Sequence, residues 1–179
     1  MAIDLTQFCS TDPERPYIHK PFSRAGYTWA TTGHILVRVP HDPAVPNGDK
    51  LACEKVFDPG FKTPTLALPV MEIPQPKTDE CEVCEGRGHA HDCPDCTCAC
   101  VECDGNGSIA QRQSIAICGV CFDVKYIRKI WALPGLLVSQ PDAAKAMSFS
   151  FDGGAGLLMP LSEPWEANFT ATVSTAQEA

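Results

Sequence analysis

The chain has 179 residues, 44% of them apolar, and a formal net charge of −8. This length suits one domain with an accessory module, and the acidic balance excludes a chain whose whole surface binds nucleic acid. The first residues, Met1-Ala2-Ile3-Asp4, lack the basic segment of a secretory signal, and the longest apolar run, residues 115–122, is too short to span a bilayer. We therefore expect a cytoplasmic protein without a membrane partner.

Short strands are predicted near the N-terminus. Residues 3–10 fit neither the helical nor the strand period cleanly and indicate a weak helix or a strand. Residues 17–23, 26–30 and 34–39 are rich in β-branched and aromatic side chains and are divided by glycine-containing turns. This pattern predicts two successive hairpins, and so three antiparallel strands.

The next forty residues are rich in proline, which favours an extended connection over regular structure. Within residues 40–79 we predict short strands around Val56 and at Leu66–Leu68.

Regular structure is predicted again from Ser108. A helix capped by Asp123 and running to about Leu133 has one apolar face, and Pro134-Gly135 ends it. The apolar face of this helix consists of Val124, Ile127, Ile130 and Trp131. Strands are predicted before and after the helix, over 109–113, 114–118, 136–139, 146–151 and 156–160. This order echoes the N-terminal part, so we predict an α+β, antiparallel β-rich domain of two β/α halves.

Seven of the eleven cysteines lie between Cys81 and Cys103. The pattern CxxCxGxG begins at Cys81 and again at Cys100. A CxxC turn places two thiolates on one side of a zinc ion, and the glycines allow tight turns whose N–H groups point at the sulfurs. Two such knuckles close a tetrahedral site, so we predict one structural zinc held by Cys81, Cys84, Cys100 and Cys103.

The middle of the segment offers ligands for a second zinc ion. These are Cys93, Cys96, Cys98 and His91, with His89 close by in the sequence. The alternative for this group is a set of free thiols in a loop. For the outer four cysteines the alternative is a pair of disulfides, which a reducing compartment disfavours.

The doubled CxxCxGxG motif resembles the cysteine-rich zinc domain of DnaJ-type chaperones, which carries four such repeats. The resemblance covers residues 81–107, where the middle CxxC lacks the GxG. It implies a zinc fold with peptide or protein contact. The segment holds six acids and one base, Arg87, so a phosphate backbone would be repelled. We expect the module to brace the fold or to contact protein.

Two other segments resemble parts of a DNA sliding clamp. Residues 122–133, followed by strands and by Gly156-Leu-Leu-Met-Pro-Leu161, are similar to the last half-domain of that family. Residues 27–38 are similar to its strand–turn–strand element, with Thr32 in place of the aspartate. The resemblance implies one clamp-like domain split by an inserted zinc module.

These observations predict four parts of the chain. The N-terminal half with its proline-rich connection covers 1–77, and the zinc module covers 78–107. The C-terminal half covers 108–165, and a disordered tail of small polar residues covers 166–179.

The clamp resemblance also implies that helices face DNA. Lys125, Arg128 and Lys129 lie on one face of the predicted helix, opposite Ile127 and Trp131. The alternative interpretation of these charges is a solvated helix face. We expect a protein partner, and leave open DNA contact through residues 125–129 and self-association.

The main enzymatic alternative is thiol redox chemistry. Cys118-Gly-Val-Cys121 precedes the predicted helix, whose N-terminus would lower a thiol pKa, although the apolar strand pattern around both cysteines favours burial. We therefore predict a non-enzymatic zinc-binding protein that acts by macromolecular interaction, in DNA replication or processivity or in phage subversion of a host system. The alternatives are a chaperone-like peptide-binding module and a thiol oxidoreductase.

Overall fold

The computed structural model describes residues 3–48, 50–89, 98–103, 105–162 and 166–175. The chain divides into two compact units, one formed by residues 1–71 and 114–179 and the other by residues 72–113. We call them the sheet unit and the cysteine unit. The cysteine unit is an insertion in the sequence of the sheet unit, and it begins and ends a few residues outside the zinc module predicted over 78–107.

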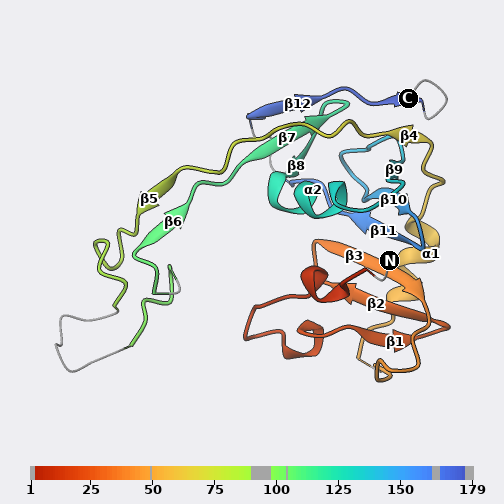
Figure 1. Cartoon of the computed structure of the whole chain (residues 1–179), viewed down its shortest axis with the longest axis horizontal. Coiled ribbons are helices and arrows are strands. Elements are labelled where there is room, and N and C mark those ends of the chain that lie inside the picture. Colours follow the sequence, from red (N-terminus) through yellow and green to blue (C-terminus); the bar gives the residue numbers. More distant parts are fainter. Residues whose placement is uncertain (1–2, 49, 90–97, 104, 163–165, 176–179) are drawn as a thin grey trace. The chain divides into compact units, whose positions relative to one another are not determined.

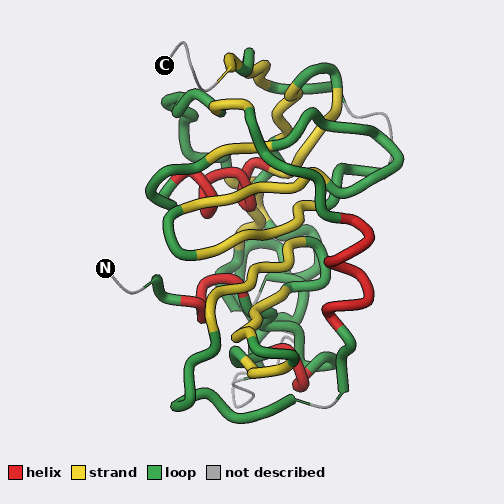
Figure 2. Tube along the Cα trace, turned by 90° about the vertical axis from the view of Figure 1, so that its right-hand side faces the viewer, coloured by secondary structure: helices red, strands yellow, loops and turns green. Residues whose placement is uncertain are grey.

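An eight-stranded sheet is the largest element of the sheet unit (Figures 1 and 2). Its strand order is β1-β2-β3-β11-β10-β9-β4-β13, and every neighbouring pair is antiparallel. The strands are β1 Phe22–Arg24, β2 Tyr27–Thr31, β3 Ile35–Pro40, β4 Leu66–Ala67, β9 Leu137–Val138, β10 Met147–Phe151, β11 Gly154–Leu158 and β13 Ser174–Thr175.

Two three-stranded meanders meet at the centre of this sheet. The first, β1-β2-β3, follows the 3-10 helix η1 (Leu5–Phe8), and the second, β9-β10-β11, follows helix α2 (Val124–Trp131). The antiparallel pair β3–β11 joins them through the last strand of each meander. The order of the six strands is therefore symmetric about this pair. A mostly antiparallel β-sheet accompanied by helices agrees with the predicted α+β class.

The two predicted N-terminal hairpins are confirmed as β1-β2-β3. Their predicted first strand began too early, because Pro16–Ile18 forms a 3-10 helix, η2. Proline fixes the φ angle that the first turn of a helix needs and cannot donate to a strand ladder.

Helix α1, Cys53–Gly60, stands where the sequence predicted a strand around Val56, and that prediction was wrong. Cys53 and Phe57 are four residues apart, so in a helix they share a face, and both are buried against the sheet unit's core. The Phe57 ring packs edge-on against Trp29 with centroids 5.5 Å apart. Val56 is 64% exposed.

Arg38 on β3 connects this helix to the sheet. Its guanidinium lies 4.4 Å from the ring centroid of Tyr27 and 3.8 Å from that of Phe57. It also forms an ion pair with Asp58 at 3.2 Å. Arginine suits this position because its planar group stacks on aromatic faces while its N–H groups bind a carboxylate.

The sheet unit has a second, three-stranded sheet, with two strands directly before α2 in the chain and the third after it. Its order is β12-β7-β8, with β12 at Phe169–Ala171, β7 at Ser114–Ile117 and β8 at Val120–Asp123. β8 was not predicted. It arises because Cys118 and Gly119 both have positive φ and form a two-residue hairpin turn, which reverses the chain after β7.

The predicted disordered tail is wrong for the described residues 166–175. β12 pairs in parallel with β7, and the Asn168 side chain accepts the Ser114 N–H at 2.8 Å. Ala171 is only 3% exposed. A polar composition suggested disorder, but these residues supply partners for the edge of β7, which would otherwise carry unpaired backbone groups.

Helix α2 forms as predicted. The Asp123 carboxylate accepts the Lys125 N–H at 2.9 Å, which caps the helix, and Val124, Ile127 and Ile130 are buried. Within the part of the chain that the structure describes, no helix has the length and apolar character needed to cross a membrane.

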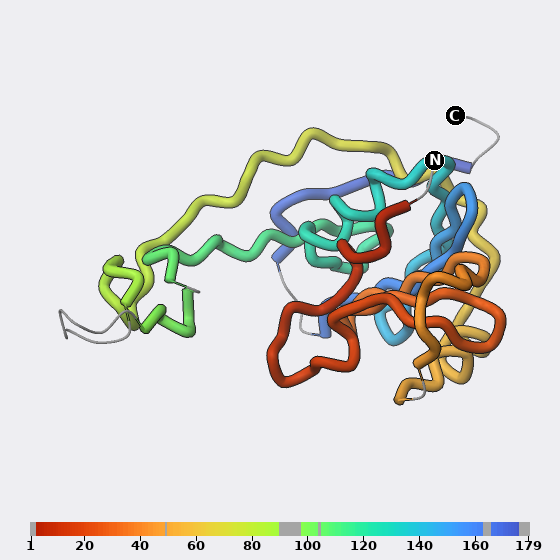
Figure 3. The backbone as a smooth tube through the Cα atoms, turned by 60° about the horizontal axis from the view of Figure 1, so that its bottom comes forward, coloured from red at the N-terminus to blue at the C-terminus, as the bar shows by residue number. Residues whose placement is uncertain are grey.

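The cysteine unit is built on a two-stranded ribbon, labelled β5 and β6 in Figure 1, and Figure 3 shows the two chain segments approaching each other at this ribbon. β5 (Thr78–Glu80) pairs antiparallel with β6 (Ser108–Ala110). β6 is shorter than the strand predicted over 109–113. Because Glu80 pairs with Ser108, the ribbon brings the residues just beyond it, Cys81 and Gly107, opposite each other.

Candidate metal centre

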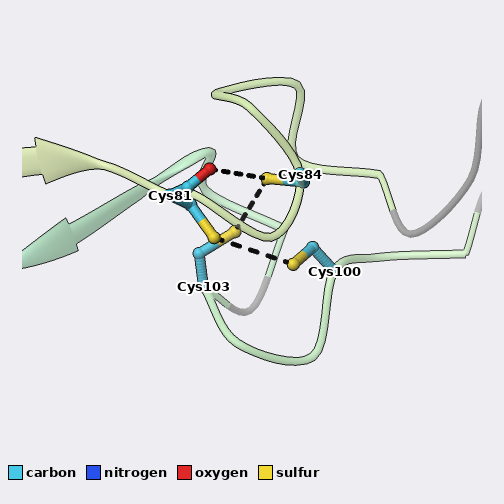
Figure 4. A group of neighbouring side chains, drawn as sticks. All are labelled: Cys81, Cys84, Cys100 and Cys103. Carbon is cyan, nitrogen blue, oxygen red and sulfur yellow. Dashed lines mark hydrogen bonds between the residues drawn. The ribbon is translucent and has the colours of Figure 1, made fainter.

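Four cysteine side chains converge beyond the end of the ribbon (Figure 4). The sulfur atoms of Cys81, Cys84, Cys100 and Cys103 all lie within 4.8 Å of one another. Each residue is buried, with exposed fractions of 0%, 1%, 1% and 5%. The structure thus brings together the four residues that the sequence predicted for the first site.

The sulfur spacing suits a metal ion and not a disulfide. The Sγ atoms of Cys81 and Cys100 are 3.9 Å apart, and those of Cys84 and Cys103 are 3.7 Å apart. Four sulfurs placed at about 2.3 Å from a central ion in a tetrahedron are separated by about 3.8 Å. A disulfide requires about 2.05 Å. The four thiols are therefore positioned to bind one ion with tetrahedral coordination.

The two knuckles are related residue by residue, with an offset of nineteen positions. The Cys81 N–H donates to the Gly107 carbonyl at 2.9 Å, and the Cys100 N–H donates to the Gly88 carbonyl at 2.9 Å. Each knuckle therefore supports the other through one matched backbone hydrogen bond. This reciprocity indicates a local two-fold arrangement about the metal position.

Backbone N–H groups also point at two of the sulfurs. Gly88 N donates to the Cys84 Sγ at 3.3 Å, and Gly107 N donates to the Cys103 Sγ at 3.2 Å. Such donors stabilise thiolate charge and fix the orientation of a ligand. The second GxG glycine of each motif supplies this donor.

These two glycines also permit the close approach of the knuckles. A Cβ atom on Gly88 would lie 2.4 Å from the Gly105 carbonyl oxygen, and one on Gly107 would lie 2.2 Å from the Gly86 carbonyl oxygen. Gly88 and Gly107 have φ values of +75° and +73°, a region that other residues rarely adopt. No side chain fits at either position without separating the two knuckles.

The thiols of the site differ in pKa. The backbone N–H groups of Cys103 and Glu102 lower the pKa of the Cys100 thiol to about 7. Burial raises the pKa of the Cys103 thiol to about 11. A metal ion replaces the protons of such thiols and offsets the charge that four neighbouring thiolates would otherwise place in one buried spot.

The predicted second zinc site lies largely outside the described residues, which leave out His91, Cys93 and Cys96. Cys98 is exposed, and His89 is exposed and forms an isolated bridge with Ala99. Among the residues that the structure does describe, the four outer cysteines are the one metal-ligand group found.

The three basic residues of α2 do not form a uniform exposed face. Lys125 is exposed and lies 3.7 Å from the Asp123 carboxylate, whereas Arg128 and Lys129 are half-buried. The Lys129 ammonium donates to the Gln7 carbonyl of η1. One of the three predicted DNA contacts, Lys129, thus also has a role within the fold.

The Cys118–Cys121 pair does not lie at a helix N-terminus. Cys118 is exposed in the β7–β8 turn, and Cys121 is half-buried within β8. Both cysteines therefore precede α2, whose N-cap residue is Asp123.

No family model, curated protein or solved structure matches this chain.

Proposed function

We propose that this chain is a zinc-stabilised, non-enzymatic protein that acts by contact with another macromolecule. The observation that carries the proposal is the group of four buried cysteine sulfurs at tetrahedral spacing. Four protein ligands fill the coordination of zinc and leave no open position for a substrate or an activated water. A closed site of this kind stabilises a fold and supplies no reaction centre.

The chemistry of the ligands favours zinc among the available metals. Four thiolates in a tetrahedron suit zinc and iron, and they do not suit magnesium or calcium, which prefer oxygen ligands. Zinc has no redox chemistry that could damage its own thiolates. We therefore assign zinc as the resident ion. Metal analysis would distinguish it from a single iron ion, which the same four thiolates could hold.

The charge of the cysteine unit favours a protein partner over nucleic acid. Residues 72–113 hold nine acids and three bases, and four thiolates around one zinc ion add two further negative charges. A phosphate backbone would be repelled by this surface. On the sheet unit, a cleft of about 270 Å³ is lined by exposed apolar side chains that protein contacts use, among them Tyr17, Val56 and Met159.

The setting that we propose is DNA replication or processivity, or phage subversion of a host system. It rests on the sliding-clamp resemblance of residues 27–38 and 122–133. The repeated helix–meander arrangement about β3 and β11 supports it, because a clamp domain is also built from two β/α halves. A reducing cytoplasm, which keeps the thiolates available for zinc, completes this proposal.

A chaperone-like peptide-binding role is the second candidate. The observation that favours it is one exposed apolar side chain inside each CxxC turn, Val83 and Val101, which are 66% and 90% exposed. Replacing both by serine would abolish capture of an unfolded model peptide if this candidate is correct, and would leave the zinc content unchanged.

Metal analysis of the purified protein tests the leading proposal. We expect Cys84→Ser to lose one equivalent of zinc per chain. The control variant Cys118→Ser, which changes an exposed cysteine of the sheet unit, should retain the zinc. A protein that carries no zinc when purified without chelators, or that carries iron, would overturn the assignment. Capture of partners from a lysate with wild type and Cys84→Ser in parallel then shows whether binding depends on the zinc-stabilised unit.

A further inference from the structure

A cleft in the sheet unit gathers positive charge, although the chain as a whole has a net charge of −8. The cleft has a volume of about 440 Å³. Lys125 and Lys129 of α2 line one side, and Arg15, in the segment that follows η1, lines another. These cations come from chain segments more than a hundred residues apart, so the fold and not the local sequence assembles them.

The lysine side of the cleft is held in place by its neighbours. Tyr126 is 7% exposed, and the ammonium groups of Lys125 and Lys129 lie 4.8 and 5.9 Å from its ring centroid. The hydrogen bond from Lys129 to the Gln7 carbonyl fixes that side chain further. Burial, followed by the charge of Lys125, lowers the pKa of Lys129.

Two like charges four residues apart on a helix repel each other. The fold nevertheless keeps Lys125 and Lys129 together beside one aromatic ring. A bound anion would relieve this repulsion and would raise the pKa of Lys129 again.

Arg15 is placed by close contact with the β2–β3 turn. A Cβ atom on Gly33 would lie 2.9 Å from the Arg15 Nη1, so the absence of a side chain there makes room for the guanidinium. One carboxylate, that of Asp12, also lines the cleft and pairs with Arg15 at 3.4 Å. Asp12 also accepts the Glu14 N–H at 3.0 Å. Lys125 is likewise paired with the Asp123 carboxylate at 3.7 Å, so the three cations meet two carboxylates, of which Asp12 lines the cleft.

Polar groups complete the cleft. His34 stacks on Tyr126 with ring centroids 5.8 Å apart, which sets the imidazole at the wall, and the hydroxyl side chains of Thr11 and Thr32 also line the space. Hydroxyl and imidazole groups beside cations are the partners that phosphate oxygens use in proteins.

We propose that this cleft binds the phosphate monoester group of a small ligand, with Lys125, Lys129 and Arg15 as its charged partners. Three cations match a dianion better than the single charge of a carboxylate. A long polyanion is disfavoured because the rest of the chain is acidic and would repel the phosphates beyond the cleft. The site is independent of the metal centre, which lies in the other unit.

Titration of the full zinc-loaded chain with inorganic phosphate tests the proposal, at fixed pH and fixed ionic strength, followed by amide chemical shifts. We expect saturable shifts at residues 9–12, 32–34 and 125–129. Arg15→Gln and Lys125→Gln should each weaken binding by about tenfold, the usual effect of removing one charge-assisted hydrogen bond. Both side chains are exposed, so neither change removes buried packing. Ribose 5-phosphate should shift the same amides and should bind at least as tightly.

Lys145→Gln is the matched control, since it removes an exposed lysine of the sheet unit that is not among the described residues lining the cleft. It should leave phosphate binding unchanged. Shifts that never saturate, or equal affinity in Arg15→Gln and wild type, would overturn the proposal. Tighter binding of a short DNA duplex than of ribose 5-phosphate at the same amides would also overturn it, in favour of a nucleic-acid surface.

Discussion

Gly107→Ala tests the architecture of the metal centre most sharply. The new methyl group would lie 2.2 Å from the Gly86 carbonyl oxygen, which is backbone and cannot rotate away. The residue would also have to keep a φ of +73°. Both hydrogen bonds of Gly107 are then at risk, from the Cys81 N–H at 2.9 Å and to the Cys103 sulfur at 3.2 Å.

The size of the effect can be worked from these contacts. The left-handed conformation costs a non-glycine residue ~1–2 kcal/mol, and loss of the two hydrogen bonds costs ~1 kcal/mol each. The sum, about 3–4 kcal/mol, corresponds to roughly a hundredfold to a thousandfold weaker zinc binding, because metal binding and folding of the site are coupled. Competition against a chromophoric chelator of known affinity measures this ratio directly.

Two control substitutions separate the causes. Gly105→Ala has a similar φ of +79°, and its closest contact would be the Ala99 methyl at 3.2 Å, so it carries the conformational cost with a mild contact. Gly119→Ala, at +79° in the β7–β8 turn, would meet nothing within 4 Å and reports the conformational cost alone, as a change in stability of the sheet unit. If Gly107→Ala binds zinc as tightly as Gly105→Ala, the reasoning from close approach is refuted.

Three further predictions follow from other contacts. Arg38→Leu should lower the free energy of unfolding by about 1–2 kcal/mol in a urea titration, because it removes the cation–π contacts and the ion pair. Arg38→Lys should recover only part of this loss. An unchanged urea midpoint for Arg38→Leu would contradict the prediction. Burial raises the pKa of the Cys9 and Cys53 thiols to about 11, so at pH 8 on the order of 0.1% of each is thiolate. Iodoacetamide should therefore alkylate the exposed Cys118 well before either of them, and peptide mass spectrometry measures the order of alkylation. Since folding favours the protonated thiols, their contribution to stability is present below the ordinary thiol pKa and is lost as pH rises through about 11. Chelation of zinc should raise hydrogen exchange in residues 72–113 and leave the sheet unit protected; equal loss in both units would show that the metal supports the whole chain.

The ligand set of the first metal centre could be predicted because its determinants are local and repeated. Each knuckle is a CxxC turn followed by glycines, and the offset between the copies is constant. What the sequence did not reveal is how the copies meet. The exchange of hydrogen bonds between Cys81 and Gly107, and between Cys100 and Gly88, depends on the register of the β5–β6 ribbon.

The errors in the sheet unit have a different cause. The strand predicted around Val56 became α1 because burial of Cys53 and Phe57 against the core decided the local structure. β12 was missed because its partner, β7, lies more than fifty residues earlier in the chain, and a short polar tail gives no sign of such pairing. Tertiary contacts outweighed local propensity in both places.

The burial pattern explains why the two units need different sources of stability. The sheet unit has its own apolar core, with fully buried Trp29, Phe57 and Phe149. In the described part of residues 72–113, the buried side chains are the four cysteines alone, and the other buried residues are glycines. Without an ion, those thiols give too little apolar burial to offset the chain entropy of the segment. We therefore expect a bound metal ion to take the place of a hydrophobic core there, while the surface of the cysteine unit remains acidic.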